Sequence, residues 1–140
     1  MQTIGKIDRT GRNRRPFLLV VDDDAAIRAT LQELFTSLDY EVATAKDGAE
    51  ALDQMARRRA DVVLTDIFMG GPDGFELIST LRTKHRETRV AAMSGGHADY
   101  DALTFANRLG ADAVIDKPFR VPHVVETVDR LIRGYPRNPL

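Results

Sequence analysis

The sequence contains no cysteine, which excludes a disulfide framework and a metal site built on thiolates. It also lacks an apolar run that approaches the length of a membrane-spanning helix, and its first fifteen residues contain no apolar core segment. The 140 residues suit one domain, and the 43% apolar and 29% charged residues are ordinary for a globular protein. We therefore expect a cytoplasmic, single-domain protein that does not insert into a membrane.

The net charge of −1 is unevenly distributed along the chain. Residues 1–16 carry five basic side chains against one acidic side chain, so the remainder bears a net charge of −5. An acidic body argues against nucleic-acid binding by this domain, because contacts with phosphates dominate that affinity. Residues 1–15 are expected to form a basic, disordered arm, which could instead contact an anionic surface. Residues 134–140, with two prolines, are expected to form a tail.

Short apolar segments alternate with segments of helical spacing between residues 17 and 133. The expected strands are 17–21, 40–45, 62–66, 89–93 and 113–115, and the expected helices are 24–38, 47–58, 74–84, 99–109 and 122–133. The segment 62–66 is apolar enough to be buried on both faces of a sheet. This alternation predicts an α/β fold, with a five-stranded parallel sheet, right-handed crossovers and five helices on both faces.

Polar side chains stand where four of the expected strands end. Asp22 and Asp23 follow the first strand, Asp66 ends the third, Ser94 follows the fourth and Lys117 follows the fifth. In open parallel sheets, ligands bind outside the carboxyl ends of the strands, at the point where the strand order reverses. We therefore expect these five side chains to gather at one edge of the sheet.

The residue types in this set indicate a particular chemistry. Three neighbouring carboxylates repel one another, and their burial is costly unless a cation joins them. Oxygen ligands without nearby cysteine or histidine indicate Mg²⁺ rather than zinc. A lysine and a small hydroxyl opposite that ion would complete a site for a phosphoryl group in transfer. Each feature alone could be a helix cap, a turn or a surface loop, and their joint order is what indicates a site.

The chain resembles the receiver domain of bacterial two-component response regulators over about residues 16–133. Five segments carry the resemblance: Val20-Val21-Asp22-Asp23-Asp24, Asp61-Val62-Val63-Leu64-Thr65-Asp66, Asp73-Gly74, Met93-Ser94-Gly95 and Asp116-Lys117-Pro118-Phe119. The resemblance implies a flavodoxin-like strand order of 2-1-3-4-5, whose switch point lies between strands one and three. It also implies a cis peptide bond between Lys117 and Pro118.

The resemblance implies a role for each acidic residue of the set. Asp66 would be the phosphoacceptor and would also contact Mg²⁺. Asp23 would be the direct Mg²⁺ ligand, and Asp22 would bind the ion through water or orient it. The backbone carbonyl of Phe68 would be a further metal ligand.

The phosphoryl-binding side of the site is implied in the same way. Ser94 would donate a hydrogen bond to one phosphoryl oxygen, and Lys117 would neutralise another. Gly95 is small enough to admit the phosphoryl group beside Ser94.

The chain departs from the family pattern at two places. Receiver domains commonly have proline four residues after the phosphoacceptor, where this chain has Gly70, with Pro72 two residues later. The aromatic switch residue that often stands three residues before the lysine is replaced by Val114. The switch surface is therefore expected around Tyr100, Val114 and Phe119, without a rotating ring.

The resemblance predicts a stand-alone response regulator, not an enzyme, that assists its own Mg²⁺-dependent phosphorylation and dephosphorylation. Its donor would be a sensor histidine kinase or a histidine phosphotransfer protein. Its output would be phosphorylation-dependent binding of a downstream protein target, or phosphorelay.

Three alternative functions would each require a different residue pattern or behaviour. A pseudo-receiver would bind proteins without accepting phosphate. A flavodoxin-like cofactor binder would have a glycine-rich phosphate loop in place of the acids at 22–24. A phosphatase with an aspartate nucleophile would have a second acid two residues later, where this chain has Phe68.

Overall fold

The computed structural model describes residues 6–7, 13–69, 73–94 and 100–134. The strands are β1 (Lys6–Ile7), β2 (Asn13–Arg14), β3 (Phe17–Val21), β4 (Glu41–Ala45), β5 (Val62–Asp66), β6 (Arg89–Ser94) and β7 (Ala113–Asp116). The helices are α1 (Ala25–Ser37), α2 (Gly48–Arg57), α3 (Asp73–Lys84), α4 (Tyr100–Leu109) and α5 (Val121–Ile132). Over the described ranges, none of these helices has the length and apolar character needed to cross a bilayer.

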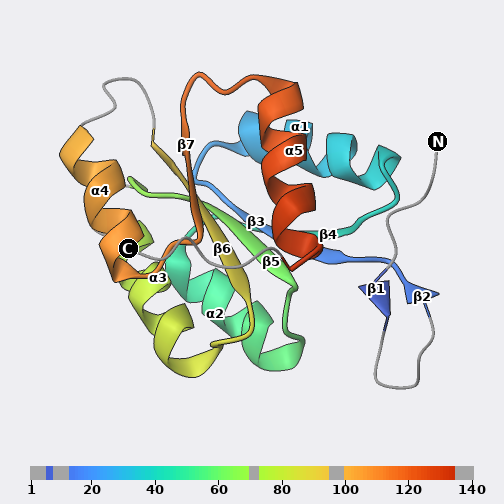
Figure 1. Ribbon diagram of the computed structural model, residues 1–140, viewed down its shortest axis with the longest axis horizontal. Coiled ribbons are helices and arrows are strands. Elements are labelled where there is room, and N and C mark those ends of the chain that lie inside the picture. The colour runs from blue at the N-terminus through green and yellow to red at the C-terminus, as the bar shows by residue number, and fades with distance from the viewer. Residues whose placement is uncertain (1–5, 8–12, 70–72, 95–99, 135–140) are drawn as a thin grey trace.

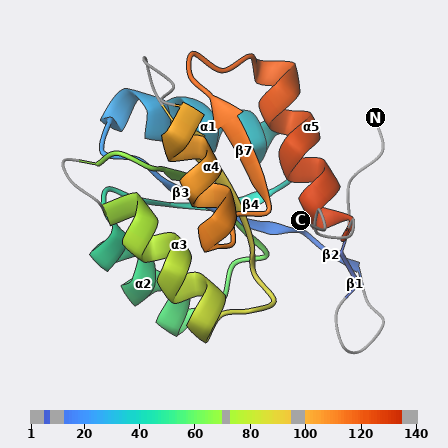
Figure 2. The ribbon, with the colours of Figure 1, turned by 60° about the vertical axis from the view of Figure 1, so that its left-hand side comes forward.

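The central sheet contains five parallel strands in the order β4-β3-β5-β6-β7 (Figure 1). Counted along the sheet-forming strands alone, this is the order 2-1-3-4-5, so the predicted fold class and strand order are confirmed. Helices α1 and α5 cover one face, and α2, α3 and α4 cover the other (Figure 2). The order reverses between β3 and β5, which makes their carboxyl ends the expected ligand edge.

Burial of the two central strands on both faces explains their nearly continuous apolar sequence. All five residues of β3 and of β5 are buried, as expected for strands covered by helices on both sides. Alternate residues enter different cores, so that Leu18 packs on the side of α1 and α5 while Leu19 packs on the side of α2 and α3. Strand β4 lies at the edge, and four of its five residues are only partly buried.

The helix ends follow the local chemistry of the sequence. The Asp24 side chain accepts hydrogen bonds from the backbone of Ala26 and Ile27, so it caps α1. Asp47 caps α2 by accepting a bond from the backbone N–H of Glu50 at 2.8 Å. Helix α4 ends before Gly110, whose φ of 116° favours glycine. The Lys117–Pro118 bond is cis, as expected.

Two short strands lie within the basic arm. Strands β1 and β2 pair antiparallel, with Lys6 opposite Arg14. Arg14 donates to both carboxylate oxygens of Asp61, at 2.9 and 3.1 Å, and the backbone N–H of Phe17 donates to Asp61 at 2.8 Å. This paired contact joins the end of the arm to the start of β3, and the expectation of disorder for residues 1–15 stays a prediction. The tail from 135 onward lies outside the described residues.

Candidate functional site

The carboxyl ends of β3 and β5 bring three acidic side chains together. The two strands pair in register, with Val21 opposite Thr65, so the residues that follow them are neighbours. Oxygen atoms from Asp22, Asp23 and Asp66 all lie within 4.8 Å of one another. Asp22 is fully buried and Asp66 is 6% exposed, whereas Asp23 is exposed. The cluster therefore has a buried floor and one member open to solvent.

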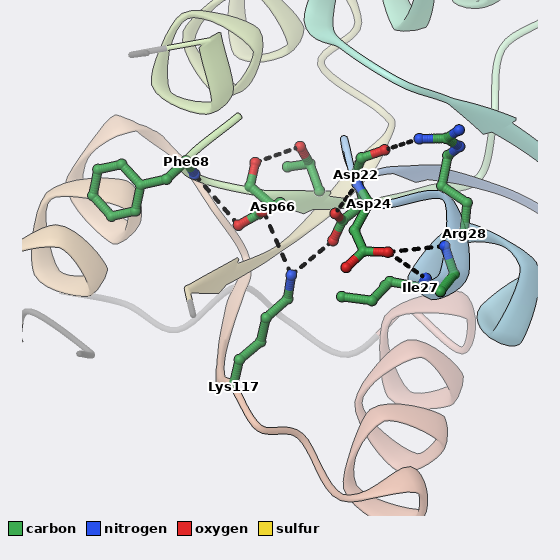
Figure 3. A network of polar contacts seen from close by, with 9 residues as sticks. Asp22, Asp24, Ile27, Arg28, Asp66, Phe68 and Lys117 are labelled. Carbon is green, nitrogen blue, oxygen red and sulfur yellow. Dashed lines mark hydrogen bonds and ion pairs between the residues drawn. The ribbon is translucent and has the colours of Figure 1, made fainter. Parts of the chain in front are cut away.

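Lys117 reaches this cluster from the end of β7 (Figure 3). Its Nζ lies 2.7 Å from Oδ2 of Asp22 and 3.5 Å from Oδ2 of Asp66. The backbone N–H of Lys117 donates to the carbonyl of Ser94 at 2.7 Å, which ties this segment to the end of β6. One ammonium thus neutralises part of the charge of two carboxylates from different strands.

Each buried carboxylate also accepts a backbone hydrogen bond. The Asp24 N–H donates to Oδ1 of Asp22 at 2.9 Å, and the Phe68 N–H donates to Oδ1 of Asp66 at 3.3 Å (Figure 3). Thr65 donates its hydroxyl to the backbone carbonyl of Asp66 at 2.9 Å. These bonds set the orientation of both carboxylates before any ligand arrives.

The electrostatics of the site follow from burial and crowding. Burial raises the pKa of the Asp66 carboxyl, and the charge of Asp22 raises it further, while Lys117 and the Phe68 N–H oppose the rise without cancelling it. Burial lowers the pKa of Lys117, but its hydrogen bond to Asp22 and the charges of both acids outweigh burial and leave that pKa raised. Lys117 therefore stays charged at neutral pH.

The residues present fit a hard divalent cation. The cluster has three carboxylates, and Lys117 pairs with two of them, so negative charge remains in excess at the cluster. The donors are oxygen atoms, which Mg²⁺ prefers, and the exposed Asp23 leaves a side through which water and a phosphate oxygen could complete the coordination. The acidic cluster of Asp22, Asp23 and Asp66 is thus a candidate Mg²⁺ site.

Ser94 supplies a hydroxyl at the same edge. Met93 pairs with Asp66 across the β5–β6 ladder, and Ser94 is the next residue. Ser94 is fully buried, and its Oγ has no hydrogen-bond partner among the described residues. A buried hydroxyl without a partner is unfavourable, so a ligand that accepts a hydrogen bond from Ser94 would remove this cost.

The remaining sequence-predicted residues lie apart from this cluster or outside the described chain. Val114, on the edge strand β7, is 37% exposed, and Phe119 is half-buried against the core on the α5 side. Tyr100 begins α4, but its side chain lies outside the described part, as do Gly95 and Gly70.

Gly74 is a site residue whose role the sequence did not reveal. A Cβ at this position would lie 2.3 Å from the carbonyl oxygen of Ile67 and 2.5 Å from that of Asp66. The Gly74 N–H also donates to the Ile67 carbonyl at 3.2 Å. Absence of a side chain thus allows α3 to begin directly against the end of β5. The Asp73-Gly74 pair was visible in the sequence, but it indicated only a turn and a helix start.

Comparisons with known proteins agree on one family. A family described as the response regulator receiver domain matches residues 18–129. The DNA-binding transcriptional regulator NtrC of Escherichia coli K12 is 35% identical over 130 residues, which cover 89% of this chain and 28% of NtrC. Sporulation initiation phosphotransferase F of Bacillus subtilis is 30% identical over 115 residues, covering 82% of this chain and 92% of that protein.

Solved structures give the same result. The receiver domain of NtrX from Brucella abortus has a TM-score of 0.79 at 30% identity and covers 84% of this chain and 99% of that one. Chemotaxis response regulator CheY4 of Vibrio cholerae has a TM-score of 0.77 at 28% identity, with 84% and 99% coverage. The chain spans little more than a quarter of the NtrC regulators that it matches.

Gly74→Ala should destabilise the protein. Replacing a helix glycine by alanine normally stabilises a protein by up to about 1 kcal/mol. Here the added methyl meets backbone oxygens that cannot move aside easily, so we expect a loss of about 1–3 kcal/mol in the free energy of unfolding. Urea denaturation measures this change, with Glu76→Ala at an exposed position of α3 as the control. Unchanged or increased stability of Gly74→Ala would contradict the close approach.

The pH dependence of stability should report the charge on Asp66. Because its pKa is raised by folding, the folded state keeps the proton to higher pH than the unfolded chain does. Stability from the neutral carboxyl is therefore present at low pH and is lost as pH rises through the folded pKa. In EDTA, Asp66→Asn should melt at a higher temperature than the parent at pH 7, with a difference that shrinks on acidification. Asp47→Asn, which keeps a capping side chain outside the acidic cluster, is the matched control. A lower melting temperature for Asp66→Asn at pH 7 would count against this account.

Proposed function

The chain belongs to the response regulator receiver domain family, and on that premise we propose that it accepts a phosphoryl group on Asp66. Receiver domains are signalling modules and not enzymes as such. One observation carries the assignment: Asp66 shares both Lys117 and the candidate cation position with Asp22. Phosphorylation-based signalling follows from the family, and the residue assignments are our proposal.

The proposed reaction uses the groups at the strand ends. An oxygen of the deprotonated Asp66 carboxylate attacks the phosphorus atom of a donor phosphohistidine. The phosphorus–nitrogen bond breaks, and its electron pair stays on the donor imidazole, which leaves an acyl phosphate on Asp66. Lys117 pairs with one phosphoryl oxygen, and the unpartnered hydroxyl of Ser94 donates to another.

The acidic cluster would hold Mg²⁺ during this transfer. Asp22, Asp23 and Asp66 provide the carboxylates, and the backbone carbonyl of Phe68 is the further ligand that we propose. When bound, the ion supplies positive charge that offsets the crowded carboxylates and the incoming phosphoryl group. Gly95 would leave space for that group beside Ser94.

The proposed partners are a sensor histidine kinase or a histidine phosphotransfer protein as donor, and a downstream protein as target. The similarity to sporulation initiation phosphotransferase F, over 92% of its length, supports phosphorelay as one route. The similarity to 28% of the length of NtrC supports a second route, in which the phosphorylated domain controls the activity of a downstream protein. The single-domain organisation and the cytoplasmic location stay predictions.

Asp66→Asn should abolish phosphorylation. Incubation of the parent with Mg²⁺ and a small phosphodonor should add one phosphoryl group to the intact mass, because Asp66 is the nucleophile. The variant should show no gain, and Asp47→Asn should label as the parent does. Labelling without Mg²⁺, or equal labelling of Asp66→Asn, would contradict the assignment. A parent that never labels would favour the pseudo-receiver alternative.

Phosphorylation should be read out through the segment between β6 and β7. Val114 is β-branched and short, so it cannot act as a swinging aromatic ring. We therefore expect a beryllofluoride adduct to change amide hydrogen exchange mainly over residues 95–109, of which 95–99 lie outside the described part. Smaller changes should appear around Val114 and Phe119. Asp66→Asn with the same reagent is the control. A response confined to the neighbourhood of Asp66 would contradict this readout.

A further inference from the structure

Three phenylalanine rings extend from the phosphoacceptor strand to α4. Phe68 follows β5, Phe75 lies on α3 and Phe105 lies on α4. The Phe68 and Phe75 rings have centroids 5.8 Å apart at 89°, and the Phe75 and Phe105 rings have centroids 5.1 Å apart at 74°. Both pairs are edge-to-face, the arrangement in which ring quadrupoles attract. We call these three residues the aromatic array.

The array is not simply a part of the hydrophobic core. Phe68 is 47% exposed and Phe105 is 49% exposed, whereas Phe75 packs against the core on the α2 and α3 side. The two outer rings therefore obtain much of their restraint from the middle ring. Phe75 is the member that links them to the fixed part of the protein.

Phe68 joins the array to the site through its own backbone. Its N–H donates to Oδ1 of Asp66 at 3.3 Å, so a shift of Phe68 moves a hydrogen bond on the phosphoacceptor. Phe68 lies near the end of the described range 13–69, and the ring of Phe75 is a contact that restrains it from across the fold.

We propose that Phe75, supported by Phe105, is a positioning residue for Asp66. It holds the Phe68 ring, so that the Phe68 N–H keeps the Asp66 carboxylate aligned with Asp22 and Asp23 for a divalent cation and for attack on phosphorus. This inference rests on the proposed function, because it concerns how the same site is arranged.

The array also joins α4 to the site by a route that does not pass through Val114. Helix α4 is connected along the chain to Ser94, and Phe105 connects it through space to Phe75. A change in the position of Phe68 therefore reaches α4 through two ring contacts.

Titration with Mg²⁺ tests the proposal without depending on phosphorylation. Calorimetry should show that Phe75→Leu binds Mg²⁺ about 3- to 10-fold more weakly than the parent, the change expected from losing an aromatic pair. The Phe68 amide should exchange faster in this variant when no metal is present. Phe75→Tyr retains the ring and should restore both values to those of the parent.

Two further variants separate positioning from packing. Leu52→Ala shortens a partly buried, non-aromatic side chain of α2 that packs against the same core cluster as Phe75. It should lower the melting temperature and leave the Mg²⁺ affinity unchanged. In a Phe68→Leu background, Phe75→Leu should cause no additional loss of affinity, because the two rings act in series.

The outcomes distinguish this inference from the proposed function. A parent that binds Mg²⁺ and accepts phosphate, combined with unchanged Mg²⁺ affinity and Phe68 exchange in Phe75→Leu, would overturn the positioning role alone. A parent that fails to bind Mg²⁺ would overturn both. If Phe75→Leu does not fold, Phe105→Leu at the exposed end of the array replaces it, and a parental Mg²⁺ affinity in that variant would overturn the proposal.

Discussion

The structure depends on two buried carboxylates that share one ammonium. Asp22 and Asp66 end up side by side because β3 and β5 are parallel neighbours, and Lys117 lies within 2.7 and 3.5 Å of them. Burial strengthens both the attraction to Lys117 and the repulsion between the acids. Because two acids pair with one ammonium, the site keeps an excess of negative charge when no cation is bound. A divalent ion or a phosphoryl group bound at this edge of the sheet therefore changes the electrostatic energy of the site more than it would at a solvated surface.

The surrounding elements keep this charge cluster in place at close range. Gly74 lets α3 begin against the backbone of Asp66, and the backbone bond from Lys117 to Ser94 holds the end of β7 beside β6. Backbone N–H groups orient both acids. We propose that the aromatic array adds further restraint through its side-chain contacts.

Much of the fold and of the candidate site could be predicted from the sequence. The strand order and the cis bond at Pro118 are confirmed. These features depend on local residue chemistry, or on a motif pattern in which polar residues follow short apolar strands. The contact between Arg14 and Asp61 was not predicted, because the two residues lie 47 positions apart and neither stands out in the sequence.

Residue order is enough to predict which groups meet at the strand ends, because parallel strands bring their carboxyl ends to one edge of the sheet. Tertiary structure alone decided how those groups are balanced: which acid is buried, which is exposed, and that Lys117 lies closer to Asp22 than to Asp66. It also decided that the rings of Phe68, Phe75 and Phe105 meet edge-to-face and that Gly74 must lack a side chain. The physical reason is that burial, ring contact and steric clash are properties of distances between elements, and those distances follow from packing of the whole chain.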